Sequence, residues 1–261
     1  MIKAKKSLGQ NFLVDKNIID KIINTVSIVD NEILEVGPGT GNLTREILKK
    51  GPSKMYLIEK DTLLAESLNE IVDERVKIFN EDILKFNENS LSKNKIKVFG
   101  NLPYNISTEI LSNWITNLKE ECWFTDLVLM FQKEVADRII AQPNTSAYGR
   151  LSILANWRLN INKICDISPE SFSPRPKIQS TLIHFTPKKK FTEIKNPINL
   201  EKITRIFFSH RRKMLKKPFN QIFNGKTDLL NKLNLDLNLR PQNLDFDTYY
   251  ILAIEYEKLR S

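Results

Sequence analysis

One segment constrains the fold of this 261-residue chain more than any other, an apolar run that enters a glycine-rich turn. Residues Ile33–Val36 are apolar and β-branched apart from one glutamate, and they lead into the sequence GPGTG at residues 37–41. Behind the turn, Leu43, Ile47 and Leu48 recur at helical spacing. Glycine is needed where a backbone bends sharply and lets another group approach closely. The segment therefore predicts a strand, a tight turn and a helix.

The spacing of the glycines indicates which kind of ligand the turn serves. The pattern is GxGxG, and because position 42 is Asn the dinucleotide fingerprint GxGxxG is not met. Gly37 and Gly39 are therefore expected to lie against a nucleoside that carries no phosphates. An apolar run over Met55–Ile58 ends in Glu59, 22 positions after Gly37, where an acid can accept hydrogen bonds from two ribose hydroxyls.

A third strand is predicted over Val76–Phe79, followed by Glu81 and Asp82. The Asp82 carboxylate could accept the amino protons of an adenine ring. Taken singly, each of these acids is more often a solvated loop charge. Because they follow three successive strands with the glycine turn, we favour a cofactor site, and the implied cofactor is S-adenosylmethionine.

The tetrapeptide Asn101-Leu102-Pro103-Tyr104 follows another apolar run, Ile96–Gly100. In an open α/β sheet the carboxyl end of a strand is where ligands bind, and proline stiffens the turn there. The Asn101 side-chain oxygen and the Leu102 carbonyl could each accept one N–H of an exocyclic base amine, while Tyr104 offers a ring face for stacking. The alternative is a turn that merely contains Asn and Pro.

Strand and helix patterns alternate from about residue 16 to 142, which predicts a mostly parallel sheet. Residues 157–187 indicate two late strands, the second over Ile178–Phe185 and antiparallel at or near the sheet edge. A polar linker follows over 187–197, and helical patterns occupy 199–209, 216–224 and 246–259. We therefore expect an α/β domain over residues 1–187, with 1–14 as an N-terminal arm, and a small helical domain over 188–261.

Positive charge is concentrated in the last part of the chain. Residues 188–261 contain 16 Lys and Arg against 8 Asp and Glu, so this part carries +8 of the net charge of +9. Its densest run contains the candidate phosphate contacts Arg211, Arg212, Lys213, Lys216 and Lys217. A solubilising charged face is the ordinary explanation of a basic run, but the asymmetry between the two halves favours contact with nucleic acid.

Other features exclude several classes of protein. Cys122 and Cys165 lack metal-binding spacing, and His184 and His210 do not complete a zinc set, so no metal is expected. The thiols suit a reducing compartment. No apolar run has membrane-spanning length and no signal peptide follows Met1, so we expect a cytoplasmic protein without membrane contact.

Six motifs occur in an order that resembles one enzyme family. They are KSLGQNFL at 6–13, EVGPG at 35–39, NLPY at 101–104, QKEVA at 132–136, YGRLS at 148–152 and FSPRPK at 172–177. Together they are similar to the bacterial small-subunit (16S) ribosomal RNA adenine dimethyltransferases, the KsgA-type enzymes, over nearly the whole chain.

The resemblance implies a Rossmann-like class I S-adenosyl-L-methionine-dependent methyltransferase sheet with a small all-helical C-terminal domain. It implies transfer of methyl groups to N6 of two adjacent adenosines near the 3′ end of 16S ribosomal RNA in the immature 30S subunit. It also implies that Asn11 and Leu13 contact the cofactor, and that Phe172 forms the second wall of the target-base pocket, opposite Tyr104. Without the resemblance, Phe172 would be interpreted as a buried plug and the arm as frayed. We expect a monomer.

Three alternatives remain open at this stage. A related methyltransferase could act on adenine N6 of 23S ribosomal RNA and confer macrolide resistance, although Leu102, Asn105 and the RRK run at 211–213 favour the small-subunit group. A non-catalytic nucleic-acid-binding factor on the same fold predicts loss of the cofactor and catalytic positions, which are all present. A small-molecule methyltransferase does not account for the basic tail.

Overall fold

The computed structural model describes residues 10–118, 121–224 and 226–260, which form two compact units. The first unit contains the described residues up to Trp114, together with Leu118–Ala136 and Asn160–Pro187. The second contains Ile115–Asn117, Asp137–Leu159 and the described residues from Lys188 onward. The change of unit after residue 187 coincides with the predicted domain boundary. Residues 137–159 differ from that prediction, because they pack with the helices of the second unit.

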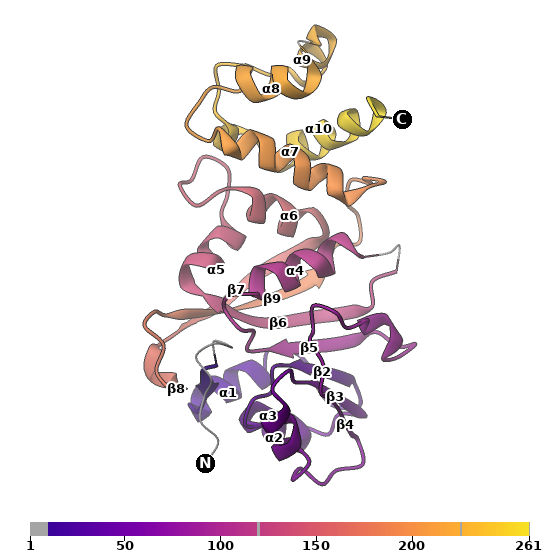
Figure 1. The fold of residues 1–261 in the computed structure, drawn as a ribbon, viewed down its shortest axis with the longest axis vertical. Helices are drawn as coiled ribbons and strands as arrows, with labels where there is room; N and C mark the ends of the chain where they lie inside the picture. Colours follow the sequence, from indigo (N-terminus) through magenta and orange to yellow (C-terminus); the bar gives the residue numbers. More distant parts are fainter. Residues whose placement is uncertain (1–9, 119–120, 225, 261) are drawn as a thin grey trace. The chain divides into compact units, whose positions relative to one another are not determined.

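The first unit is built on a sheet of seven strands (Figure 1). Their order is β4 (Val76–Phe79), β3 (Lys54–Ile58), β2 (Glu32–Val36), β5 (Ile96–Gly100), β6 (Phe124–Gln132), β9 (Ser180–Pro187) and β7 (Leu159–Ile167). The strands β4, β3, β2, β5 and β6 are parallel, and β9 runs antiparallel to β6. The fold class predicted from the sequence is confirmed. The late antiparallel strand is next to the edge, which β7 forms.

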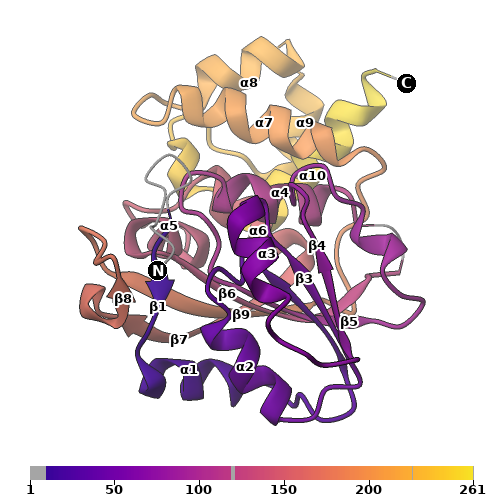
Figure 2. The same ribbon diagram turned by 60° about the horizontal axis from the view of Figure 1, so that its bottom comes forward.

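The predicted strand, turn and helix at the start of the sheet are present. β2 ends at Val36, and α2 (Asn42–Lys49) begins directly after Gly41. The strand is buried along its whole length, as expected for a parallel strand covered on both faces. Alternate residues serve different faces, so Ile33, Phe99 and Val128 pack in one core with α1 (Lys16–Ile23), α2 and α3 (Thr62–Leu68) (Figure 2).

Two helices run from the first unit into the second. They are α4 (Ser107–Thr116), which follows the NLPY turn, and α5 (Lys133–Ile140), which follows β6. Two short 3₁₀ helices, Glu88–Ser90 and Pro169–Ser171, complete the connections of the first unit.

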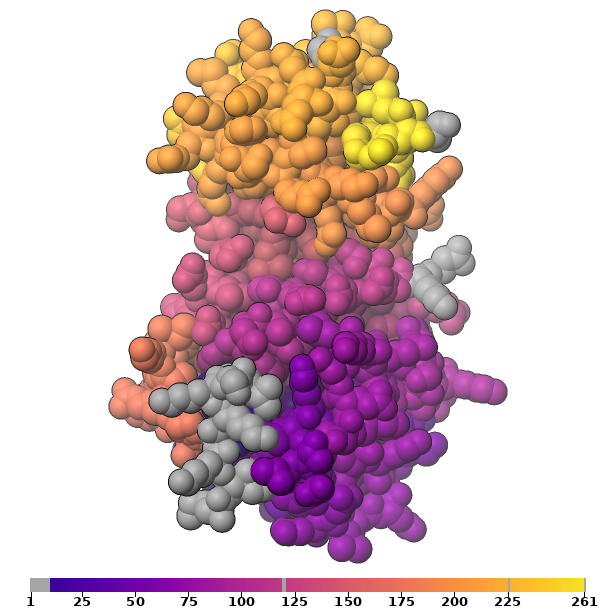
Figure 3. Space-filling view, viewed as in Figure 1, coloured from indigo at the N-terminus to yellow at the C-terminus, as the bar shows by residue number. Residues whose placement is uncertain are grey.

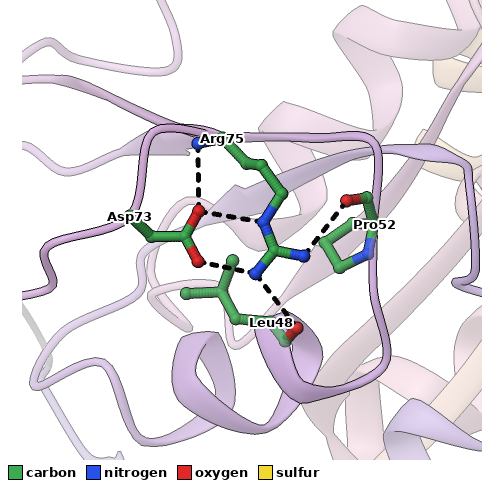
Figure 4. Close-up of polar contacts among 4 residues, drawn as sticks. All are labelled: Leu48, Pro52, Asp73 and Arg75. Atoms are coloured by element: carbon green, nitrogen blue, oxygen red, sulfur yellow. Dashed lines mark hydrogen bonds and ion pairs between the residues drawn. The ribbon is translucent and has the colours of Figure 1, made fainter.

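An arginine fork fixes the turn before the edge strand β4 (Figure 4). Arg75 donates to Asp73 through Nε at 2.9 Å and through Nη2 at 2.6 Å, and its guanidinium also reaches the carbonyls of Leu48 and Pro52 at 3.5 Å. The adjacent guanidinium lowers the pKa of Asp73 to about 2. The fork ties the C-terminal end of α2 to the start of β4, and β4 leads to one of the predicted cofactor acids.

A separate two-stranded sheet joins the arm to a distant loop. β1 (Phe12–Leu13) pairs antiparallel with β8 (Phe172–Ser173), with Leu13 opposite Phe172. The bond from Val14 N–H to the Ser171 carbonyl, 2.9 Å long, extends the pairing. Residues 10–14 are therefore ordered, in contrast to a frayed end. Residues 1–9 of the predicted arm lie outside the described part.

The second unit is helical. It contains α6 (Arg150–Arg158), α7 (Pro197–Ser209), α8 (Lys216–Phe223), α9 (Thr227–Leu233), α10 (Phe246–Lys258) and a 3₁₀ helix, Pro241–Asn243. The three predicted helices correspond to α7, α8 and α10, whereas α9 was not predicted. The Tyr250 hydroxyl donates to the Ile153 carbonyl at 3.2 Å and Trp157 Nε1 donates to the Thr192 carbonyl at 2.7 Å. These bonds hold α6 in the helical unit.

In the described ranges, no helix is both long and apolar enough to cross a membrane. Cys122 and Cys165 are half-buried and form no disulfide. The described residues also contain no cluster of His, Cys, Asp or Glu suited to a metal ion.

Candidate active site

The glycine turn between β2 and α2 has the backbone that only glycine adopts readily. Gly37, Gly39 and Gly41 have φ values of 70°, 58° and 76°. A Cβ at Gly39 would lie 2.7 Å from Cδ1 of Phe12, so the aromatic ring of the arm occupies the space beside this residue. The Gly37 N–H donates to the Ile58 carbonyl at 3.0 Å, which ties the turn to β3.

Two buried carboxyl groups lie beside this turn. Glu59 accepts hydrogen bonds from the backbone N–H groups of Gly39, at 3.1 Å, and Asp61, at 2.9 Å, one on each oxygen. Burial raises the pKa of Glu59. Glu35 is 2 % exposed and accepts from the Thr44 hydroxyl at 2.6 Å. Burial, assisted by the nearby Glu59 charge, raises the pKa of Glu35 to about 7.

The third predicted acid follows β4. Asp82 forms an ion pair with Lys60 at 2.7 Å, and its other oxygen accepts from the Leu84 N–H at 3.1 Å. The hydrogen bond from Lys60 lowers the pKa of Asp82. Asp82 is therefore a carboxylate near neutral pH, and each of its oxygens keeps a lone pair for another donor.

Residues 10–13 of the arm cross the glycine turn as a strap. The Asn42 side-chain amide donates to the Leu13 carbonyl at 2.8 Å, and Gln10 Nε2 donates to Asp61 at 3.0 Å. These two contacts hold the strap at its two ends, and the ring of Phe12 holds its middle beside Gly39. We call residues 10–13 the strap below.

The strap also determines how Asn101 is oriented. Nδ2 of Asn101 donates to the Asn11 carbonyl at 2.7 Å. Because the amide nitrogen is engaged there, the side-chain oxygen Oδ1 is left to accept a hydrogen bond from another group. In this orientation Asn101 can accept an N–H from the amine of a substrate.

The rest of the NLPY turn is held by its own backbone. The Pro103 carbonyl accepts from the N–H groups of Ile106, at 3.1 Å, and Ser107, at 3.0 Å. Leu102 is buried and Tyr104 is half-buried, with its hydroxyl 2.5 Å from Oγ of Ser180. Burial raises the pKa of Tyr104, which keeps this ring neutral near pH 7.

One cavity brings together all of the predicted cofactor residues and, apart from Phe172, all of the predicted catalytic residues. It is lined by the predicted cofactor residues Asn11, Leu13, Gly37, Gly39, Glu59, Asp82 and Asn101, and by Leu102, Pro103 and Tyr104 of the predicted catalytic set. The cavity thus brings together two carboxyl groups, two glycines of positive φ and an oriented amide, which suit an adenosine-containing cofactor beside a second substrate.

The family described as ribosomal RNA adenine dimethylase matches residues 1–258 of this chain. The chain belongs to that family. The dimethylase is thus an S-adenosyl-L-methionine-dependent methyltransferase, and the cofactor predicted from the strand ends is confirmed.

Relatives are similar in sequence to the dimethylase over nearly its whole length. The ribosomal RNA small subunit methyltransferase A of Pelagibacter ubique (strain HTCC1062) is 61 % identical over 259 residues and covers 99 % of both chains. A protein of the same name from a Wolbachia strain of Drosophila simulans is 41 % identical and covers 99 % of this chain and 96 % of its own.

Solved structures give the same result for the fold. The crystal structure of a dimethyladenosine transferase from Plasmodium falciparum superposes with a TM-score of 0.80 at 27 % identity, covering 95 % of this chain and 98 % of its own. The 23S rRNA methyltransferase ErmE superposes with a TM-score of 0.69 at 20 % identity, covering 96 % and 100 %, which shows a shared fold.

Phe172 of the dimethylase lies apart from the cavity lining. It is 3 % exposed and packs in the core with Leu13, its partner in the β1–β8 sheet. The predicted stacking of Phe172 on the target base stays a prediction, and it requires the ring to leave this core. The residues after it, 173–175 and 177–179, are exposed, and this part of the chain is coloured salmon in Figure 3.

The predicted basic residues of the dimethylase divide into two groups. Arg211 donates to the carbonyls of Thr145, at 3.4 Å, and Ser146, so it fastens a loop of its own unit. The other four, Arg212, Lys213, Lys216 and Lys217, line a surface hollow together with His210, Met214, Asn220, Asn238 and Arg240. No acidic side chain is among the described residues that line this hollow.

Three residues of the site, Glu35, Asn42 and Ser180, are not among the predicted site residues. An acid inside an apolar strand is the sequence signal that points to Glu35. The contacts of Asn42 and Ser180 could not be predicted, because they join segments far apart in the chain.

Proposed function

We propose that this dimethylase methylates N6 of two adjacent adenosines near the 3′ end of 16S ribosomal RNA, in the immature small subunit. The names of its relatives support the choice of the small subunit. The orientation of Asn101 supports the chemistry, and this one observation carries the proposal. The proposal includes a cytoplasmic enzyme that acts as a monomer.

Asn101 and Leu102 are proposed to bind the amine. The lone pair of an adenine N6 amine is delocalised into the ring, which makes it a poor nucleophile. When Oδ1 of Asn101 and the Leu102 carbonyl each accept one N–H, the nitrogen is drawn towards tetrahedral geometry and its lone pair is freed. The bonds therefore strengthen as the amine reacts, which is the requirement for a lower barrier.

Tyr104 and Pro103 are proposed to hold the base. The aromatic face of Tyr104 stacks on an adenine that has left the RNA helix, and the proline keeps the turn rigid. The neutral phenol suits stacking on a neutral base. The attack needs no general base in this arrangement, because positioning and hydrogen bonding supply the activation. After each transfer the methylated nitrogen loses one proton to water.

Asn11, Leu13, Gly37, Gly39, Glu59 and Asp82 are proposed to hold the cofactor. When bound, S-adenosylmethionine supplies the methyl group on a sulfonium, which is a good leaving group. Glu59 is suited to accept the ribose hydroxyls, since its two oxygens are already aimed by backbone N–H groups. Asp82 is suited to accept the adenine amino group of the cofactor.

The second unit is proposed to contact RNA phosphates through Arg212, Lys213, Lys216 and Lys217. These side chains line one hollow, and their contacts should weaken as salt rises. Arg211, which we also predicted to bind RNA, is assigned a supporting role in our proposal, because its guanidinium is engaged by two carbonyls.

The test is transfer of labelled methyl from S-adenosylmethionine to unmethylated small subunits, with large subunits as the control. N6,N6-dimethyladenosine found only in the small-subunit RNA is the expected result. Label in the large-subunit RNA alone would favour the 23S enzyme. Tight RNA binding without transfer to either subunit would favour a binding factor.

A further inference from the structure

The position of the Tyr104 ring depends on a second residue from a distant strand. The backbone around Tyr104 is fixed by the bonds to the Pro103 carbonyl, but a tyrosine side chain can still rotate about its own bonds. Its hydroxyl lies 2.5 Å from Oγ of Ser180, at the first position of β9. The ring is therefore held at both of its ends.

Ser180 is a rigid anchor for this contact. It is fully buried, so its hydroxyl has no competing bond to solvent. Its place is set by the sheet, because Ser180 pairs with Gln132 of β6 and the Lys133 N–H donates to the Gln179 carbonyl at 2.9 Å.

We infer that Ser180 is a positioning residue for methyl transfer, acting through the hydroxyl of Tyr104. This inference rests on the proposed function, in which the Tyr104 ring stacks on the target adenine. A ring held only at its backbone end can adopt several orientations, and only those that present the face to the base are productive. The hydrogen bond between the Ser180 and Tyr104 hydroxyls selects one of them before the base arrives.

Three variants test the inference. Ser180→Ala and Tyr104→Phe remove the same hydrogen bond from opposite sides, and both keep the aromatic ring. The third variant combines them. Loss of one hydrogen bond corresponds to about a fivefold fall in the single-turnover rate constant at saturating substrates. Because the two hydroxyls act as one unit, the double variant should be no slower than either single variant.

Two further readouts separate positioning from general damage. The cofactor Kd and the KM for small subunits should stay within about twofold of the wild type, since phosphate contacts supply most of the RNA affinity. Thr181→Val is the matched control, because it breaks a half-buried hydrogen bond, from the Thr181 hydroxyl to Asp166 at 2.7 Å, at the adjacent position without touching Tyr104. It should lower the thermal midpoint and leave the rate constant unchanged.

The inference is overturned if Ser180→Ala and Tyr104→Phe both transfer at the wild-type rate, if their losses multiply in the double variant, or if Thr181→Val is equally slow. If Ser180→Ala does not fold, Tyr104→Phe alone decides, and a wild-type rate overturns the inference. A wild-type enzyme that transfers no methyl group would instead refute the proposed function, and this inference with it.

Discussion

Gly39→Ala tests whether the strap is part of the cofactor site. The residue has a φ of 58°, where an alanine costs about 1–2 kcal/mol relative to glycine. Its new Cβ would lie 2.7 Å from Cδ1 of Phe12, closer than carbon atoms approach, so the Phe12 ring must move. The first effect lowers stability, whereas the second displaces the strap.

The expected loss of affinity follows from the displaced ring. Full burial of a phenylalanine side chain is worth about 1.5–3 kcal/mol, and Phe12 is half-buried, so moving its ring into solvent forfeits about 1 kcal/mol. Binding must then restore the strap against this cost. Since 1.4 kcal/mol corresponds to tenfold in Kd, we expect the cofactor Kd to rise about fivefold.

Gly51→Ala is the matched control. Gly51 also has a positive φ, 71°, but a Cβ there would meet nothing within 4 Å. Gly51→Ala should lose about 1–2 kcal/mol of unfolding free energy in urea. Gly39→Ala should lose more, because it also loses the burial of the Phe12 ring, and only Gly39→Ala should bind the cofactor more weakly. Calorimetric titration with S-adenosylhomocysteine, which cannot react, measures the Kd.

A third variant isolates the contact itself. Phe12→Ala removes the obstructing ring, so adding Gly39→Ala to it should weaken cofactor binding no further. The reasoning is refuted if Gly39→Ala binds with the wild-type Kd, or if Gly51→Ala weakens binding to the same extent.

Four further predictions concern other residues. Asn101→Ala should abolish methyl transfer while RNA binding, measured by filter retention, stays nearly intact, because phosphate contacts lie elsewhere; retained transfer would mean that another group positions the amine. Arg212→Ala should weaken RNA binding and reduce its salt dependence by about one charge, whereas Arg211→Ala should lower the thermal midpoint by losing two carbonyl contacts; the reverse pattern would contradict our assignment. Glu35→Gln should gain stability relative to the wild type as pH rises from 4.5 to about 7. Over this range the wild type loses stability, because its unfolded state releases the Glu35 proton while its folded state still holds it. Parallel profiles of urea stability against pH would disprove this. Tyr148→Phe should preserve the thermal midpoint or raise it, because the buried Tyr148 hydroxyl has no hydrogen-bond partner among the described residues. The gain in unfolding free energy is at most about 1–3 kcal/mol. A clear loss of stability would reveal a partner such as a bound water.

The parts of the fold that could be predicted from the sequence are local. The strand over Ile96–Gly100 was predicted with its observed bounds, because a short apolar run flanked by polar residues has few alternatives. The gathering of Glu59, Asp82 and Asn101 followed from one rule, that the carboxyl ends of parallel strands meet at one edge. The short helix α9 was missed because its pattern spans only seven residues.

The parts that could not be predicted are contacts between distant segments. Asn101 and Asn11 are 90 positions apart, and Tyr104 and Ser180 are 76 apart. Such pairs depend on how the sheet closes, which periodicity does not encode. The difference between Arg211 and Arg212 has the same origin, since adjacent arginines in a basic run look alike until one is seen to bind carbonyls.

The pairing of β1 with β8 has a consequence for how the enzyme is made. Leu13 meets Phe172, roughly 160 residues later, so the strap is tied down only when most of the chain has been synthesised. The anchor for Tyr104, at the start of β9, emerges later still. A nascent chain that has completed the parallel strands β2–β6 thus has the glycine turn and the acids. It still lacks the pairing that holds the strap and the residue that anchors Tyr104. The cavity can therefore be completed for cofactor and substrate only after residues 172–180 have left the ribosome.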